Sequence, residues 1–324
     1  MSRELMLLRH GKSDWSQQLD DFDRPLKDRG KRGAQRLGVW LQQQELVPDL
    51  VVSSPAERAI TTAQKLVKAM GGDASQIVKD RRIYAARAEE LLAVLSELEA
   101  THRRVMLVGH NPGLEDLTQF LADKPIPMPS DGKLLPTASL SILELPDNWQ
   151  GLKAGMGQLL SITRASGLPK KFPFPDHKGK EQRDRPAYYY NQSSVIPYRI
   201  RDGKPEILVV MSSKRKHWVV PKGVSDPATT LQASAAKEAF EEAGVEGEVG
   251  EAALGSYKYE KWGADCTVKV YPMRVTHIID EEAWEESHRG REWLTPKQAV
   301  KQVKQEELKP MIEKLVKQLE GKKR

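Results

Sequence analysis

The sequence has 324 residues, of which 39% are apolar and 30% are charged, and its formal net charge is +6. The length predicts about two domains, and the composition is ordinary for a soluble globular protein. The positive charge is compatible with anionic ligands, but no Lys/Arg block is long enough to favour nucleic acid.

No targeting or membrane segment is apparent in the sequence. The chain runs from Met1-Ser2-Arg3-Glu4 straight into a predicted strand, without the layout of a signal peptide. No apolar run approaches the roughly 20 residues that span a membrane. The single cysteine, Cys266, cannot form an intramolecular disulfide and fits a reducing compartment. We therefore expect a cytoplasmic protein with no membrane partner.

Three predicted strands in the first half of the chain each lead into cationic residues. Residues 5–8 lead into Arg9-His10-Gly11, residues 49–52 into a turn with Arg58, and residues 105–108 into Gly109-His110-Asn111. Continuous apolar runs are typical of buried parallel strands, and open α/β sheets build their sites at the carboxyl ends of strands. We therefore expect these side chains to lie together at one edge of a sheet.

The residue types at this edge indicate phosphate chemistry. A single histidine in such a place is more often structural, but two histidines and two arginines are harder to explain that way. Guanidinium groups suit bidentate binding of phosphate. One imidazole could attack phosphorus and carry the phosphoryl group, while the second could hold charge on the equatorial oxygens.

Together these motifs resemble the histidine phosphatase superfamily over about residues 1–163. The resemblance rests on Leu8-Arg9-His10-Gly11, on Ser53-Ser54-Pro55 with Arg58, and on Gly109-His110-Asn111. Asp23-Arg24-Pro25-Leu26 with Arg29-Gly30 is similar to the small SixA-type branch of phosphohistidine phosphatases. The resemblance implies a three-layer α/β domain that needs no metal. In it His10 is the phosphorylated nucleophile, and Arg9, Arg58 and His110 form the phosphate pocket.

The general acid of this domain is open. Glu89 and Glu90 follow Tyr84-Ala85-Ala86-Arg87-Ala88, and either could donate the proton or could be a solvated helix residue. Glu89 is placed slightly ahead, and Asp14 is a third candidate.

Residues 166–186 are predicted to be a linker between domains 1–165 and 187–324. The segment is rich in Pro and Gly and contains the basic residues Lys170, Lys171, Lys178, Lys180, Arg183 and Arg185. An anion- or RNA-contacting arm could use these charges, but a soluble spacer is favoured. Tyr188-Tyr189-Tyr190 could stack on bases, but we expect these aromatic residues to belong to a strand.

A predicted helix from about Thr230 to Ala243 carries three carboxylates on one face. Glu238, Glu241 and Glu242 are three or four residues apart, and Gly244 is a natural stop signal. Crowded carboxylates repel one another, so the arrangement favours a hard cation such as Mg²⁺ or Mn²⁺ that bridges to substrate phosphates. The alternative is a solvated acidic face that pairs with Lys237.

With its surroundings, this helix resembles the Nudix box, G-x5-E-x7-R-E-U-x-E-E-x-G-U, where U is aliphatic. Gly223, Glu238, Glu241, Glu242, Gly244 and Val245 match the motif. Thr229 stands in place of the first Glu and Lys237 in place of the Arg, two residues that often brace the loop in the family. The resemblance implies an α/β/α sandwich with a mixed sheet. It also implies a metal held by the three glutamates and the Gly223 carbonyl, with Lys222 at the substrate.

The stretch from Trp284 to Trp293 resembles W-P-E-x-x-R-x-R-x-W of the diphosphoinositol-polyphosphate and diadenosine-polyphosphate branch, with Glu285 in place of Pro. The resemblance implies that Arg289 and Arg291 hold phosphates and that Glu286 could add a metal carboxylate. The alternative is a charged loop before the last helix, with Trp293 in the core.

The sequence therefore predicts a two-domain phosphohydrolase. The first domain is a metal-independent phosphatase of phosphohistidine or phosphomonoesters that acts through a phosphohistidine intermediate. The second is a Mg²⁺-dependent pyrophosphohydrolase of nucleoside or dinucleoside polyphosphates, and a phosphohistidine protein is a further candidate partner. Two alternatives stay open: a tandem enzyme in which the phosphatase processes the Nudix product, and a Nudix domain that only binds ligand and regulates the phosphatase.

Overall fold

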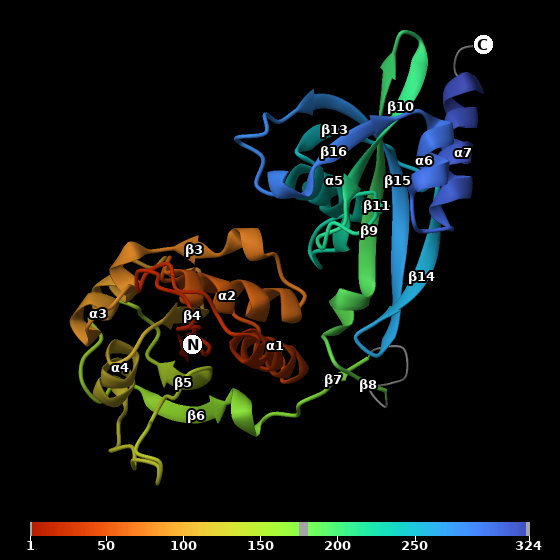
Figure 1. Cartoon of the computed structure of the whole chain (residues 1–324). Coiled ribbons are helices and arrows are strands. Elements are labelled where there is room, and N and C mark those ends of the chain that lie inside the picture. Colours follow the sequence, from red (N-terminus) through yellow and green to blue (C-terminus); the bar gives the residue numbers. More distant parts are fainter. Residues whose placement is uncertain (1, 175–180, 322–324) are drawn as a thin grey trace. The chain divides into compact units, whose positions relative to one another are not determined.

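The computed structural model describes residues 2–174 and 181–321, and the chain divides into two compact units, Met1–Phe172 and Pro173–Arg324 (Figure 1). The division falls within the predicted linker, of which residues 175–180, including Lys178 and Lys180, lie outside the described part. Next to them, β7 (Phe172–Pro173) and β8 (Gln182–Arg183) form a two-stranded sheet. No helix in the described residues has both the length and the apolar character needed to cross a membrane.

The first unit contains a six-stranded sheet with the order β3-β2-β4-β1-β5-β6. Its strands are β1 (Arg3–Arg9), β2 (Leu50–Ser53), β3 (Val78–Lys79), β4 (Arg104–Gly109), β5 (Ser139–Leu145) and β6 (Gln158–Arg164). The first four are parallel and the last two antiparallel. The carboxyl ends of β1, β2 and β4 therefore meet at one edge.

Helices cover both faces of this sheet, as expected for strands that are apolar on both sides. The helices are α1 (Asp28–Gln43), α2 (Glu57–Ala69), α3 (Ala88–Ser96) and α4 (Gly113–Leu121). Met6 and Leu8 pack with α1 and α2 in one core, and Leu5 and Leu7 pack with α3 and α4 in the other. The alternation along β1 produces the predicted three-layer domain.

The second unit contains an eight-stranded mixed sheet. Its strands are β9 (Asn191–Arg201), β10 (Lys204–Met211), β11 (Trp218–Val219), β12 (Lys222–Val224), β13 (Val245–Val249), β14 (Gly255–Lys261), β15 (Ala264–Ile278) and β16 (Arg291–Leu294). β9 and β15 are parallel, and the other pairs are antiparallel. Asp202 and Gly203, with φ of 50° and 73°, make the turn between β9 and β10, as the Asp-Gly sequence predicts.

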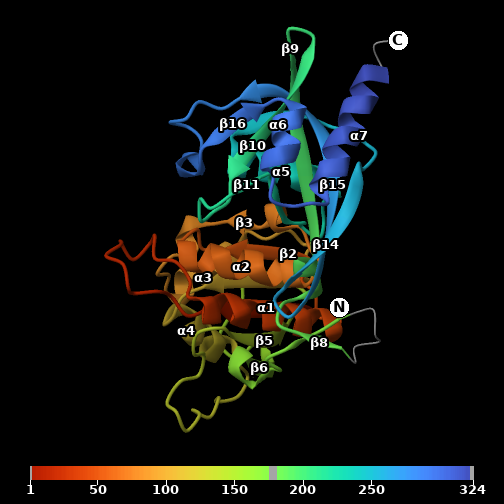
Figure 2. The same ribbon diagram turned by 45° about the vertical axis from the view of Figure 1, so that its right-hand side comes forward.

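Helices on opposite faces complete a sandwich in this unit (Figure 2). α5 (Leu231–Ala243) packs its alanines against one face, and α6 (Pro296–Gln302) and α7 (Leu308–Gly321) cover the other. α5 is capped by the Thr230 side chain, which accepts from the Ala233 amide, and ends at Gly244 in the left-handed region. The predicted α/β class and both architectures are confirmed.

Two local expectations are wrong. Tyr188–Tyr190 do not extend the strand, because a 3-10 turn over Ala187–Tyr190 is closed by the Tyr189 amide on the Pro186 carbonyl, and β9 starts only at Asn191. The amphipathic pattern over residues 296–319 predicts one terminal helix, but the helical segment is broken at Val303. There the chain turns extended and the Lys304 amide donates to the Trp218 carbonyl beside β11.

Candidate active sites

His10 follows β1 and is held in one tautomer. Its Nδ1 lies 2.7 Å from the Gly11 carbonyl oxygen, which can only accept, so Nδ1 carries the proton. The Arg58 Nε–H donates to Nε2 over 3.4 Å. The side chain is 8% exposed. Nε2 is therefore the unprotonated nitrogen, and its lone pair can attack once it leaves the long contact with Arg58.

Burial keeps both histidines of this site uncharged. Burial, with smaller contributions from Arg58 and Arg9, lowers the pKa of His10 to about 4. His110, which follows β4, has its pKa lowered to about 3, again mainly by burial and then by His10. The two rings are 5.1 Å apart between centroids. A neutral imidazole is the form that can act as a nucleophile.

The two arginines supply the positive charge of the site. Arg9 donates to the Leu135 carbonyl over 2.8 Å, and its buried Nε has no partner within the described residues. Burial lowers the pKa of Arg9, but the group stays a cation at neutral pH. His110 Nε2 lies 2.9 Å from Ser54 Oγ, while its buried Nδ1 is likewise unpaired in that part of the chain. The unpaired Arg9 Nε–H suits a bound oxyanion, and His110 Nδ1 does so in the tautomer that carries its proton there.

The sequence motifs do not identify Asp21, which accepts hydrogen bonds from the two terminal nitrogens of the Arg58 guanidinium. Asp21 Oδ2 lies 2.7 Å from Arg58 Nη2 and accepts from the Tyr84 hydroxyl at 3.0 Å, and the Asp21 carbonyl accepts from Arg58 Nη1. Despite some burial, the hydrogen bonds from Arg58 and Tyr84 lower the pKa of Asp21, so it is an anion. This carboxylate occupies donors that a phosphate would use.

The three proposed general acids lie away from these contacts. Glu90 accepts from the Arg87 amide at the start of α3, and Glu89 is exposed on the same turn. Asp14 accepts from the Ser16 amide and lies 3.6 Å from Lys27 Nζ. The assignment of Glu89 stays a prediction.

In the second unit, two of the three glutamates predicted to hold a metal reach from α5 to β12, where Glu238 lies against Gly223 and Glu242 accepts from the Lys222 amide, while Glu241 lies 3.7 Å from Lys237 Nζ. The Glu238 carboxylate lies against Gly223, where an added Cβ would be 1.9 Å from Oε1, so a larger residue there would displace this carboxylate. Burial, followed by the charges of Glu242 and Glu241, raises the pKa of Glu238 to about 7. Burial also raises the pKa of Glu241.

This donor set fits a hard divalent cation. It offers carboxylate oxygens, and a cation would offset both the burial and the mutual repulsion that raise the pKa of Glu238. In residues 2–174 and 181–321, no three His, Cys, Asp or Glu side chains already have metal-site spacing. The glutamates would therefore have to draw together around the ion.

The residues assigned to substrate phosphates make contacts within the protein. Arg289 is 4% exposed, and its Nη1 lies 2.7 Å from Glu242 and 2.8 Å from Glu286. Arg291 donates to the Ala243 and Gly244 carbonyls at the end of α5, where a cation also complements the helix dipole.

Lys222 Nζ lies 3.0 Å from the Tyr259 hydroxyl and 3.5 Å from Gln192 Oε1. Its backbone N–H donates to Glu242. The substrate roles of Lys222, Arg289 and Arg291 stay predictions.

Thr229 and Lys237, the two residues that differ from the Nudix motif, still connect the loop to α5. Lys237 Nζ lies 3.5 Å from Asp226 and 3.7 Å from Glu241, so an ion pair still joins the loop to α5. Thr229 Oγ1 lies 2.8 Å from Ser234 Oγ, between the same two elements. The brace is therefore present, with Asp226 as its acid.

Comparisons with known proteins give a match for each unit. A model of the histidine phosphatase superfamily (branch 1) matches residues 5–84, and a model of the NUDIX domain matches residues 191–315. Diphosphoinositol polyphosphate phosphohydrolase 3-beta of Bos taurus is 34% identical over 120 residues, which cover 36% of this chain and 70% of that protein. The second unit belongs to the Nudix family, and residues 5–84 match the histidine phosphatase superfamily.

Two further similarities concern single domains. Nudix hydrolase 12, mitochondrial, of Arabidopsis thaliana is 29% identical over 167 residues, which cover 44% of this chain and 81% of that protein. A structure of putative phosphohistidine phosphatase SixA from Nakamurella multipartitia overlaps 51% of this chain and 96% of its own, with 25% identity and a TM-score of 0.43.

Both families are hydrolase families, so this histidine phosphatase–Nudix protein is a phosphohydrolase. Nudix domains generally need a divalent metal, and histidine phosphatases do not.

Proposed function

We propose that the first unit hydrolyses phosphohistidine or phosphomonoesters through a phosphorylated His10. The observation that carries the proposal is the fixed tautomer, with Nδ1–H on the Gly11 carbonyl and Nε2 unprotonated. The Nε2 lone pair forms a bond to phosphorus as the bond to the leaving group breaks. Arg9, Arg58 and His110 hold the phosphoryl oxygens. Water then attacks phosphorus, the P–Nε2 bond breaks, and phosphate leaves.

The test of this function is to trap the intermediate. The full chain is mixed with ³²P-labelled phosphohistidine protein or with a labelled phosphomonoester and is then denatured. We expect an acid-labile label on the protein that is absent in His10→Ala. His102→Ala is the matched control, because His102 is a partly exposed histidine that pairs with Asp49 at 3.6 Å. Label or turnover that survives in folded His10→Ala rejects the proposal.

We propose that the second unit cleaves diphosphate bonds of nucleoside or dinucleoside polyphosphates with Mg²⁺, or with Mn²⁺ in its place. Glu238, Glu241, Glu242 and the Gly223 carbonyl would hold the ion, which when bound activates water and neutralises the diphosphate. Arg289 orients Glu242 through a 2.7 Å contact, and Lys222 presents its ammonium beside Gln192. The names of the relatives make diphosphoinositol polyphosphates a second substrate class to assay.

A substrate panel at fixed Mg²⁺ tests this second activity. We expect Glu242→Gln to lose most turnover of diadenosine tetraphosphate. Glu246→Gln, an exposed glutamate on β13, should keep it. Equal rates in the two variants would reject the assignment.

Because Cys266 is buried and free, we place the protein in the reducing cytoplasm.

A further inference from the structure

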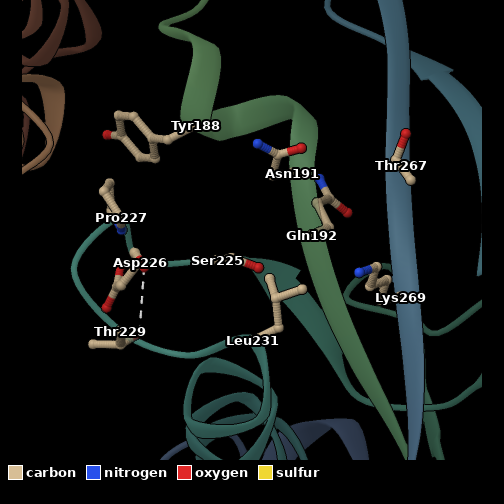
Figure 3. A pocket seen from close by; sticks show the side chains of 10 residues that line it. All are labelled: Tyr188, Asn191, Gln192, Ser225, Asp226, Pro227, Thr229, Leu231, Thr267 and Lys269. Carbon is tan, nitrogen blue, oxygen red and sulfur yellow. Dashed lines mark hydrogen bonds between the residues drawn. The ribbon is translucent and has the colours of Figure 1, made fainter. Parts of the chain in front are cut away.

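The Nudix unit has a cavity that Glu238, Glu241 and Glu242 do not line. Its volume is about 500 Å³, within the range of small-molecule sites. It lies between the loop before α5 and the strands β9 and β15 (Figure 3). The residues that line it include Tyr188, Asn191, Ser225, Asp226, Pro227 and Lys269.

Ser225 places an unpaired hydroxyl in this cavity. The residue is 5% exposed, and its Oγ has no hydrogen-bond partner in the part of the chain that the structure describes. Figure 3 shows the side chain directed away from its loop into the space before β9 and β15. A buried hydroxyl without a partner is costly, so the cavity is suited to a polar ligand.

The charges around the cavity favour an anion. Lys269 on β15 is exposed and has no ion-pair partner among the described residues. The carboxylate of Asp226 is offset by Lys237 Nζ at 3.5 Å. Leu231, the first residue of the 13-residue helix α5, also lines the cavity, so the N-terminal turn of that helix lies beside it.

The remaining lining suits a planar ring. Tyr188 and Pro227 lie on the side of the cavity opposite Lys269 (Figure 3). Asn191 lies between these two sides and offers an amide donor and acceptor. We propose that this cavity binds a nucleoside monophosphate. Lys269, Ser225 and the first turn of α5 hold the phosphate, and the base lies against Tyr188 and Pro227. The site is separate from the hydrolytic glutamates.

Calorimetric titration of the full chain with AMP tests the proposal. The chain carries His10→Ala, so that AMP is not turned over, and EDTA removes divalent metal. We expect one binding event to weaken about tenfold or more in Lys269→Gln and in Ser225→Ala, because each loses a contact to a charged phosphate. Lys301→Gln on α6 removes an exposed lysine that does not line the cavity, and it should leave this event unchanged.

Two further measurements distinguish this cavity from the site at the hydrolytic glutamates. The Glu242→Gln variant should still bind AMP, and loss of AMP binding in this variant would place AMP at the hydrolytic glutamates and overturn the proposal. Unchanged affinity in both Lys269→Gln and Ser225→Ala overturns it as well. Adenosine and inorganic phosphate should each bind more weakly than AMP. Phosphate that binds as tightly as AMP would reject the contact with the base.

Discussion

At the scale of single residues, the lowered pKa of His10 makes a prediction about pH. A nucleophilic imidazole must be neutral, and burial holds the pKa of His10 at about 4 instead of its ordinary 6.5. Phosphatase kcat, which does not depend on the ionisation of free phosphomonoester near pH 6, should therefore stay level as pH falls through 6.5 and decline only near pH 4. The measurement is a pH–rate profile, with circular dichroism to confirm that the fold persists. An acid limb near pH 6.5 would show that His10 is not the buried neutral base described here.

Asp21 gives a second residue-scale prediction. Asp21→Asn keeps an oxygen for Tyr84 but removes the charge that competes with phosphate for Arg58. We expect KM and the inhibition constant of inorganic phosphate to fall by about tenfold, the effect of one weakened charged contact. The check is steady-state kinetics with phosphate as inhibitor. If kcat instead collapses with KM unchanged, Asp21 is a proton donor and not a competitor.

The sequence could predict His10, Arg58 and His110, because each follows an apolar strand and parallel strands meet at their carboxyl ends. It could not predict Asp21. That residue reaches Arg58 only because the polar loop before α1 folds back across 37 positions of sequence. No local pattern encodes such a contact.

At the scale of elements, Gly223 joins β12 to the carboxylates of α5. Gly223→Ala would place a Cβ 1.9 Å from Glu238 Oε1, and this contact forces the carboxylate away from its place. We expect Nudix turnover to fall about 100-fold, since small misplacement of a reacting group has costs of this order. Phosphatase activity of the same variant serves as the control. Nudix kinetics like those of the parent would show that the Glu238 position is unimportant.

The helix α5 itself could be predicted, since its cap Thr230 and stop Gly244 are local signals. The ion-pair partner of Lys237 could not be predicted from the sequence. The family pattern directs attention to position 229, but the loop brings Asp226 to the lysine instead. The turn at Tyr188–Tyr190 could not be predicted either, because the sequence favours a strand there. Aromatic residues favour strands on average, whereas the hydrogen bond to the Pro186 carbonyl decides this case.

At the scale of the whole molecule, the two chemistries draw on different residues, and we predict that they are independent. His10→Ala should abolish phosphatase activity and leave Nudix turnover unchanged. Glu242→Gln should do the reverse, because it removes one oxygen charge from the proposed metal site. EDTA should act like Glu242→Gln, since Arg9, Arg58 and His110 provide the positive charge of the phosphatase site without metal.

The decisive measurement is both activities in both variants and in the double variant, each with and without EDTA. Independent sites require the double variant to show each single loss unchanged, since effects at sites without shared partners add. Loss of phosphatase activity in folded Glu242→Gln would contradict independence and favour regulation of the first unit by the second. Faster release of phosphate from the Nudix product than from added mononucleotide would favour the tandem enzyme, because that difference requires product to pass between the two sites.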